Sequence, residues 1–339
     1  MGWFPAPSYA LRMNLFPPQP AKFLGFIAAP ILLGLPCIIS GQTVVTLVGT
    51  GGPELTQGRA GEATAIEAGG QALLFDAGRG ALDGLYQSRI RPQAVTRVFL
   101  THLHSDHIEG LPGLWITPWF LLGRTEPLEV WGPVGTAAMV AGMRAMFGHD
   151  LEKRAVGGLR REGLEIAVHE IGPGVVYEDG GVRVTAIAVE HADGDPAFAY
   201  RVDTADSRIL LTGDCTLSGA LAQMTGPLDL VISNVAAVGR AVEGNPRWKP
   251  ILAKLMSPEQ AAKLFENTKP RLAVYSHIVK KSLPGQEGDE EIVRRTREAG
   301  YSGPLVVGMD HTRILLGATV RIEHPTGTLP DFDGPGSQF

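Results

Sequence analysis

The segment THLHSDH, residues 101–107, most constrains what this chain can fold into, because it packs three histidines and an aspartate into one short stretch. Each imidazole brings polar nitrogens that must find a partner when the ring is buried, so an ordinary core strand or loop has no use for so many of them. A metal ion is a partner that satisfies several such nitrogens at once. The segment therefore indicates a metal site, provided that the rest of the chain supplies further ligands.

Potential ligands recur at the ends of predicted strands. His102 follows VFLT, and three later strands end in the same way, at His191 after AIAVE, Asp214 after ILLTG and His277 after AVYS. One rigid sheet edge can hold side chains from distant positions around a single point, so these residues are expected to converge with the histidine segment. The set exceeds what one tetrahedral zinc ion can use. Two metals that share a carboxylate are the natural solution.

The remaining pattern is one of short apolar runs separated by turn residues, which is typical of a sheet-rich protein. Helical patterns are fewer, and we expect helices over 136–147, over 257–267 with Ser257 as N-cap and Pro258 as first residue, and from 289 onward. Mixed sheets with helices on their outer faces fit this order. Strands are predicted over 43–49, 63–69, 71–78, 95–102, 182–191, 197–204, 207–214, 228–234 and 271–277, with a hairpin at residues 69 and 70.

Length and charge limit the possible functions. A chain of 339 residues with 44% hydrophobic residues can bury one large core, and we expect a single catalytic domain over 42–322 with a flexible tail over 323–339. The net charge of −5 supplies no basic surface for a polyanion. We therefore expect no nucleic acid partner.

Residues 1–41 have a different composition from the rest of the chain. They contain no acidic residue, and Arg12 and Lys22 precede the uncharged run 23–39. This arrangement is typical of a signal peptide, so we expect a periplasmic or secreted protein. The alternative is a retained membrane anchor over 23–39, although two prolines inside the run disfavour a spanning helix. Translation from Met13 is a further open possibility.

The motifs resemble those of a known family. THLHSDH matches the H-x-H-x-D-H signature of the metallo-β-lactamase superfamily, and its companions EHAD, TGDC and YSHI follow in the expected order. The wider context is similar to the ribonuclease Z-like and arylsulfatase-like branch through LVGTGGP, EAGGQALLFDAGRG, EGLPGLWITPW and SPEQAAKLF, over about 43–307. The resemblance implies an α/β fold, the αβ/βα sandwich of two mixed β-sheets with helices on the outer faces.

The resemblance also implies a dinuclear centre built from the motif residues. One metal would lie on His102, His104 and His191, and the second on Asp106, His107 and His277. Asp214 would bridge the two. Imidazole nitrogens and carboxylate oxygens suit zinc, so two divalent ions, expected to be zinc, could share a water as a hydroxide nucleophile. Asp106 and Asp214 are the expected catalytic residues.

Three functions are compatible with this site. The leading one is hydrolysis of a small ester, an aryl sulfate or a phosphodiester, and the second is a lactonase or β-lactam hydrolase on the same centre. The third is a metal-binding protein with little turnover. It is motivated by Leu255, where relatives often have a general-acid histidine, and by Asn234, where they tend to have an acidic or histidine-containing stretch. The resemblance also suggests a homodimer, in which LWITPWFLL could form the interface.

Residues that contact the substrate are not predicted by the pattern. Trp115 and Trp119 could wall an aromatic pocket or belong to the core. Arg79 and Arg124 could clamp an anion or tie loops together through backbone carbonyls. Cys215, which follows Asp214, could be a small buried residue or a thiol that ligates metal.

Overall fold

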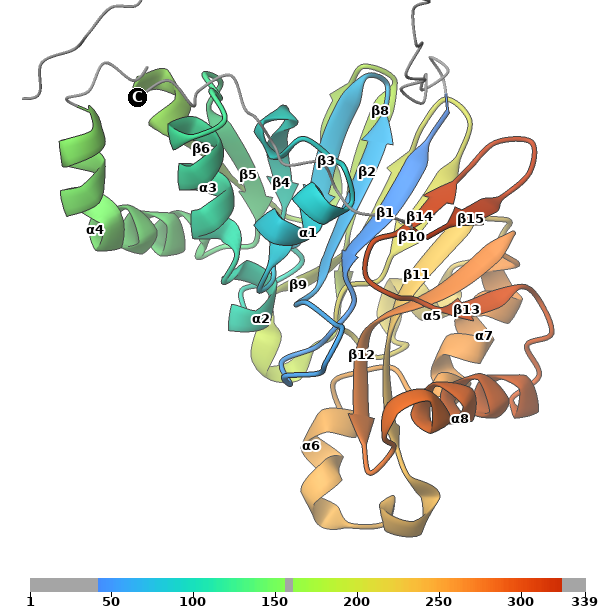
Figure 1. The fold of residues 1–339 in the computed structure, drawn as a ribbon. Coiled ribbons are helices and arrows are strands. Elements are labelled where there is room, and N and C mark those ends of the chain that lie inside the picture. The colour runs from blue at the N-terminus through green and yellow to red at the C-terminus, as the bar shows by residue number, and fades with distance from the viewer. Residues whose placement is uncertain (1–41, 156–160, 325–339) are drawn as a thin grey trace, which may run out of the picture. The chain divides into compact units, whose positions relative to one another are not determined.

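The structure is a computed structural model that describes residues 42–155 and 161–324, and its strands form two mixed β-sheets (Figure 1). Within the described residues, the first sheet has the order β15-β14-β1-β2-β3-β4-β5-β6. The pairs from β15 to β3 are antiparallel, and those from β3 to β6 are parallel. Its strands are β1 (Val44–Gly49), β2 (Ala63–Ala68), β3 (Gln71–Phe75), β4 (Val95–Phe99), β5 (Leu128–Gly132), β6 (Ile166–Glu170), β14 (Thr312–Leu315) and β15 (Arg321–Glu323).

The second sheet has the order β13-β12-β11-β10-β9-β8-β7, also within the described residues. Its pairs from β13 to β10 are parallel and those from β10 to β7 are antiparallel. Its strands are β7 (Gly174–Asp179), β8 (Val182–Val189), β9 (Ala197–Asp203), β10 (Arg208–Leu211), β11 (Leu230–Val238), β12 (Leu272–Lys281) and β13 (Leu305–Val307). Each sheet therefore has an antiparallel part and a parallel part.

The core lies between the two sheets. Phe75 and Phe99 of the first sheet pack with Tyr200, Val202 and Ile232 of the second in one buried apolar cluster. The Phe75 and Phe99 rings stack with their centroids 5.0 Å apart. Alternate side chains of each strand point inward, and burial of this apolar surface holds the sheets together.

Helices cover the outer faces of the sheets (Figure 1). The first sheet packs in one apolar cluster with α1 (Ala81–Gln87), α3 (Leu111–Phe120) and α4 (Thr136–Ala155). The second packs with α5 (Gly219–Gln223), α7 (Pro258–Thr268) and α8 (Gly285–Glu298). Short helices α2 (Ser105–Ile108) and α6 (Lys249–Leu252) lie in the connections. The predicted αβ/βα sandwich is confirmed.

Local sequence signals account for several element boundaries. The Ser257 side chain accepts a hydrogen bond from the Gln260 backbone amide, and the Gln260 side chain accepts one from the Ser257 amide, which completes a capping box at the start of α7. Between β2 and β3, Gly69 and Gly70 have φ values of 57° and 75°, as a tight hairpin turn requires. The predicted N-cap and hairpin are both confirmed.

Strands β11 and β12 differ from the prediction, since they continue past Asn234 and His277 instead of ending there. The register passes from Ser233 opposite Tyr275 to Val235 opposite Ile278, so β12 carries one extra residue as a β-bulge. His277 lies in this bulge with a φ of 44°. A bulge re-aims the side chains beside it, which is how a residue inside a strand can face the same point as residues at strand ends.

The apolar segment after the histidine motif belongs to the core. Trp115 and Trp119 of α3 are buried, with 0% and 2% of their surface exposed, so neither walls a substrate pocket. Leu121, near the end of the same segment, is 44% exposed, and the homodimer stays a prediction. Arg124 is also buried, and its guanidinium donates to the carbonyls of Leu114, Trp115 and Gly163, so it ties loops together.

The predicted terminal segments, 1–41 and all but the start of 323–339, lie outside the described residues, and the signal peptide or anchor stays a prediction. Strand β15 includes Glu323, one residue beyond the expected domain boundary at 322. Within 42–155 and 161–324, no helix combines the length and apolar character needed to cross a membrane.

Candidate metal centre

All seven residues predicted to bind metal come together, from both sheets. His102 lies just beyond β4, Asp106 and His107 lie on α2, His191 follows β8, Asp214 follows β10, and His277 lies in the bulge of β12. Their ligand atoms form three overlapping groups, in each of which all atoms lie within 4.8 Å of one another. These groups are His102, His104 and His191; His102, His107 and Asp214; and Asp106, His107 and His277.

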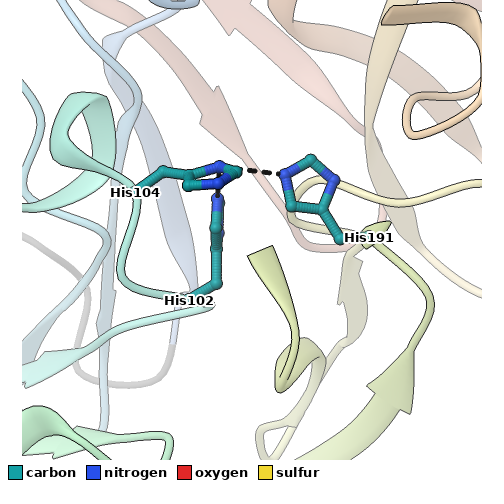
Figure 2. A group of neighbouring side chains, drawn as sticks. All are labelled: His102, His104 and His191. Atoms are coloured by element: carbon teal, nitrogen blue, oxygen red, sulfur yellow. Dashed lines mark hydrogen bonds between the residues drawn. The ribbon is translucent and has the colours of Figure 1, made fainter. Parts of the chain in front are cut away.

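Three rings form what we call the three-histidine group, His102, His104 and His191, which Figure 2 shows converging on a common point. Nδ1 of His104 lies 3.0 Å from Nε2 of His102 and 3.1 Å from Nε2 of His191. Burial lowers the pKa of both His102 and His191, so these rings are neutral and each has one nitrogen with a free lone pair.

Hydrogen bonds determine which nitrogen of each ring carries that lone pair. The Thr101 hydroxyl donates to Asp76, so it accepts from Nδ1 of His102 at 3.0 Å. The carbonyl of Lys254 accepts from Nδ1 of His191 at 2.9 Å. Both Nε2 atoms are therefore unprotonated and face Nδ1 of His104. Lone pairs that meet at 3 Å repel one another unless a proton or cation lies between them, so the donor set fits a metal ion.

The other candidate ligands, Asp106, His107, His277 and Asp214, also bring carboxylate oxygens and imidazole nitrogens close together. Oδ2 of Asp214 lies 3.5 Å from Nε2 of His107 and 3.7 Å from Nε2 of His191, and Oδ1 lies 3.0 Å from Nδ1 of His277. Oδ2 of Asp106 lies 3.2 Å from Nε2 of His277. Asp214 thus faces histidines of both groups, as a bridging carboxylate must.

Nε2 of His107 is buried and has no hydrogen-bond partner within the described residues. Oδ1 of Asp214 and Nδ1 of His277 are buried 3.0 Å apart, with no partner beyond this mutual contact. A buried polar atom without a partner costs about 1–3 kcal/mol, so these atoms fit a site that binds a cation. Burial would raise the pKa of Asp214, but His277 and His107 hold it well below its usual range. The ionised carboxylate attracts positive charge into the site, as protons or as a metal.

Asp76 is a residue of the candidate centre that the sequence reasoning missed. It follows β3 with a φ of 58°, is buried, and accepts hydrogen bonds from the amide and hydroxyl of Thr101 and from Nδ1 of His107, each at 2.8 Å. The hydrogen bond to Asp76 keeps a proton on Nδ1, so Nε2, which faces Asp214, is the nitrogen of His107 that could bind a metal. The sequence did carry a signal for Asp76, because this carboxylate follows the apolar run LLF much as Asp214 follows ILLTG.

Glu62 is the second residue that was missed, and nothing in the local pattern indicates it. Its Oε2 accepts from the Ser276 hydroxyl at 2.6 Å and from the His277 amide at 2.9 Å, so it holds the bulge of β12. Burial raises the pKa of Glu62 to about 7. A cavity of about 20 Å³ between Glu62, Asp76 and Asp214 is large enough for one water molecule.

Asn234 has a structural role beside the site. Its amide nitrogen donates to the carbonyls of Gly213 at 2.7 Å and Cys215 at 3.2 Å, and its oxygen accepts from the amide of Met256 at 2.9 Å. These bonds fix the loop that carries Asp214. An asparagine here therefore supports the site, although its presence had motivated the binding-only hypothesis.

Leu255 and Cys215 take no part in the ligand set. Leu255 is buried in an apolar cluster with Ala236 and Val279. The Cys215 thiol is buried and donates to the carbonyl of Thr212 at 3.5 Å, and burial raises its pKa. The thiol is a small core group, as the first of the two interpretations expected.

Known proteins are similar to this chain in sequence and in fold. A family model described as "Beta-lactamase superfamily domain" matches residues 71–278. The ribonuclease Z of Mycobacterium sp. (strain KMS) is 35% identical over 255 residues, which cover 72% of this chain and 87% of that protein. The ribonuclease Z of Mycobacterium bovis (strain BCG / Pasteur 1173P2) is 31% identical over 277 residues, which cover 80% and 97%.

Solved structures agree on the fold. The metallo-β-lactamase fold protein YhfI from Bacillus subtilis superposes with a TM-score of 0.62 at 17% identity, over 81% of this chain and 99% of that one. The short form of human tRNase Z gives a TM-score of 0.61 at 22% identity, over 81% and 99%.

These comparisons correct one expectation from the sequence. The curated relatives bear the name of a ribonuclease, so the prediction that nucleic acid is excluded as a partner is wrong, and a small-molecule ester loses its support as the substrate. Net charge was a poor guide because it averages over the whole surface, whereas a phosphate is bound by a few local charges and metal ions. By the family match and its close relatives, the chain belongs to the metallo-β-lactamase superfamily and is a hydrolase of that superfamily with ribonuclease Z homologues.

Proposed function

We propose that this protein is a metal-dependent phosphodiesterase that hydrolyses RNA. The observation that carries the proposal is the convergence of imidazole and carboxylate lone pairs that Asp76, Thr101 and the Lys254 carbonyl direct inward. The curated relatives named ribonuclease Z, which align with most of this chain, supply the substrate class.

The proposed centre holds two divalent ions, and zinc is the expected metal because nitrogen and carboxylate ligands suit it. The three-histidine group would hold one ion, and Asp106, His107 and His277 would hold the other, with Asp214 between them. Two such ions activate a water nucleophile and stabilise the charge that develops on the phosphate.

The proposed roles of Asp214 and Asp106 differ because their side chains are exposed to different degrees. The side chain of Asp214 is 4% exposed and contacts histidines of both groups, which suits a bridging ligand. The side chain of Asp106 is 12% exposed, so it can reach a water molecule. Burial would raise the pKa of Asp106, but the hydrogen bond with His277 lowers it, so the carboxylate is ionised and can orient that water.

The test is hydrolysis by the purified full-length protein of a structured RNA and of bis(p-nitrophenyl) phosphate, each with and without chelator. We expect chelator-sensitive turnover of both, restored by zinc, and a loss of at least about 100-fold in His104→Ala and Asp106→Ala. His169→Ala is the matched control, because His169 stacks on Trp131 away from the ligand groups.

Two results would reject the proposal. One is RNA cleavage that persists unchanged in chelator and in both site variants, since the cleavage would then not depend on the proposed metal centre. The other is metal-dependent turnover of a lactone or a chromogenic β-lactam without turnover of either phosphodiester, which would replace the proposal with the carbonyl-directed alternative.

A further inference from the structure

The candidate centre is open to solvent on one side, at His104. The side chain of His104 is 30% exposed. The other site histidines are nearly closed off: the whole residue is 0% exposed for His102, and the side chains of His107, His191 and His277 are 0%, 1% and 4% exposed. Among the site histidines, His104 is therefore the one that a substrate phosphate can reach from solvent.

An ion pair borders this open side of the centre. Oδ1 of Asp193, in the short 3₁₀ helix η3 (Ala192–Gly194), lies 3.8 Å from Nε2 of His104. The ammonium of Lys254, which follows α6, lies 3.0 Å and 3.3 Å from the two oxygens of Asp193. Gly194 permits the close approach, because a Cβ there would lie 2.1 Å from Cδ2 of His191 and 3.0 Å from Cε1 of His104.

Lys254 contacts the candidate centre through its backbone and, by way of Asp193, through its side chain. Its backbone carbonyl accepts the Nδ1 proton of His191, and its ammonium pairs with the carboxylate that faces His104. Among the ion pairs of Lys and Arg in the described residues, this is the one whose carboxylate also contacts a site histidine. The Asp193 side chain is 68% exposed, and exposed pairs are worth little, so the ammonium can exchange this partner for a substrate oxygen.

In-line displacement determines which substrate oxygen arrives there. The attacking and leaving oxygens lie on opposite sides of the phosphorus. Asp106, which orients the water in the proposed function, belongs to the group with His277, whereas the Lys254 ammonium lies beside the three-histidine group. An oxygen that leaves on the side away from that water could therefore reach the ammonium.

We propose that Lys254 stabilises the leaving ribose oxygen of an RNA phosphodiester, through a hydrogen bond from its ammonium. This inference rests on the proposed function. The oxygen of water forms a bond to phosphorus, and the bond from phosphorus to the ribose oxygen breaks with its electron pair on that oxygen. Lys254 stabilises the resulting charge, and solvent water supplies the proton that completes the alcohol.

The test compares two leaving groups in the full-length protein. A ribose alkoxide is a poor leaving group that needs stabilisation, whereas p-nitrophenolate from bis(p-nitrophenyl) phosphate needs little. We expect Lys254→Ala to lower kcat on RNA by about 100-fold and on the aryl diester by less than about 3-fold. Lys254→Arg should restore part of the loss. Lys263→Ala, an exposed lysine on α7, is the matched control, and metal content by mass spectrometry should equal that of the wild type.

Several other results would overturn the inference. An equal loss on both substrates, or a fall in metal content, would show that the Lys254 side chain supports the centre as a whole and not the leaving oxygen, and would overturn the inference. Unchanged RNA cleavage in Lys254→Ala would also overturn it. A wild-type protein that hydrolyses the aryl diester but never RNA would reject the proposed function first, and this role with it.

Discussion

The substitution Asp76→Asn tests the claim that hydrogen bonds prepare the site for metal. In the wild type, Oδ1 of Asp76 accepts from the Thr101 amide, and Oδ2 accepts from the Thr101 hydroxyl and from Nδ1 of His107. Asparagine has nearly the same shape and can keep its oxygen toward the Thr101 amide. Its NH₂ group then meets Nδ1 of His107, and two donors cannot share a hydrogen bond.

The conflict is relieved if His107 changes tautomer. Nδ1 then accepts from the asparagine, and the ring proton moves to Nε2, which faces Oδ2 of Asp214 at 3.5 Å and would bind the metal in the wild type. Loss of an outer hydrogen bond to a metal-binding histidine typically costs about 10- to 100-fold in metal affinity. Each tenfold is about 1.4 kcal/mol, so the expected loss of metal-binding free energy is about 1.4–2.8 kcal/mol.

The assay is a zinc titration of metal-free protein against a chromogenic chelator of known affinity. Asp206→Asn is the matched control, because Asp206 also accepts from threonine hydroxyls, those of Thr43 and Thr204, but precedes β10, whereas Asp214 follows it. We expect weaker zinc binding in Asp76→Asn alone. Equal zinc affinity in both variants and the wild type would refute the idea that Asp76 fixes the His107 tautomer.

Three further predictions concern stability, measured by urea unfolding of the full-length protein. Ser257→Ala removes the side-chain oxygen that caps α7 and should cost about 1 kcal/mol; a change near zero would mean that the capping box contributes nothing. Asn234→Asp turns a carboxylate oxygen toward the carbonyls of Gly213 and Cys215 and should cost about 3 kcal/mol, and wild-type stability would contradict that buried contact. Lys269→Gly should stabilise by about 1 kcal/mol, since Lys269 ends α7 with a φ of 43°; destabilisation would show that its side chain matters more than the backbone strain.

The ligand residues were predictable because their signal is local. Three histidines and an aspartate in seven residues, with His or Asp after several later apolar runs, are visible without knowing which strands pair. Apolar runs between turn residues likewise indicate strands, and Ser257 before Pro258 indicates the start of a helix. These features depend on backbone propensity and on neighbours within a few residues.

The orienting groups were hidden because they come from far along the chain. Asp76 is 31 residues from His107, and the Lys254 carbonyl is 63 residues from His191. No periodicity links such pairs, and only the packing of one sheet on the other brings them into contact.

The sequence by itself therefore determined the fold family and which side chains gather at one edge of the sandwich, because strand pattern and motif spacing are local properties. The tertiary structure alone decided which ring nitrogen of each histidine faces inward, that the bulge in β12 turns His277 toward the others, and that His104 forms the open edge. These features depend on partners that meet only when the two sheets pack together, and the chemistry of the site depends on them.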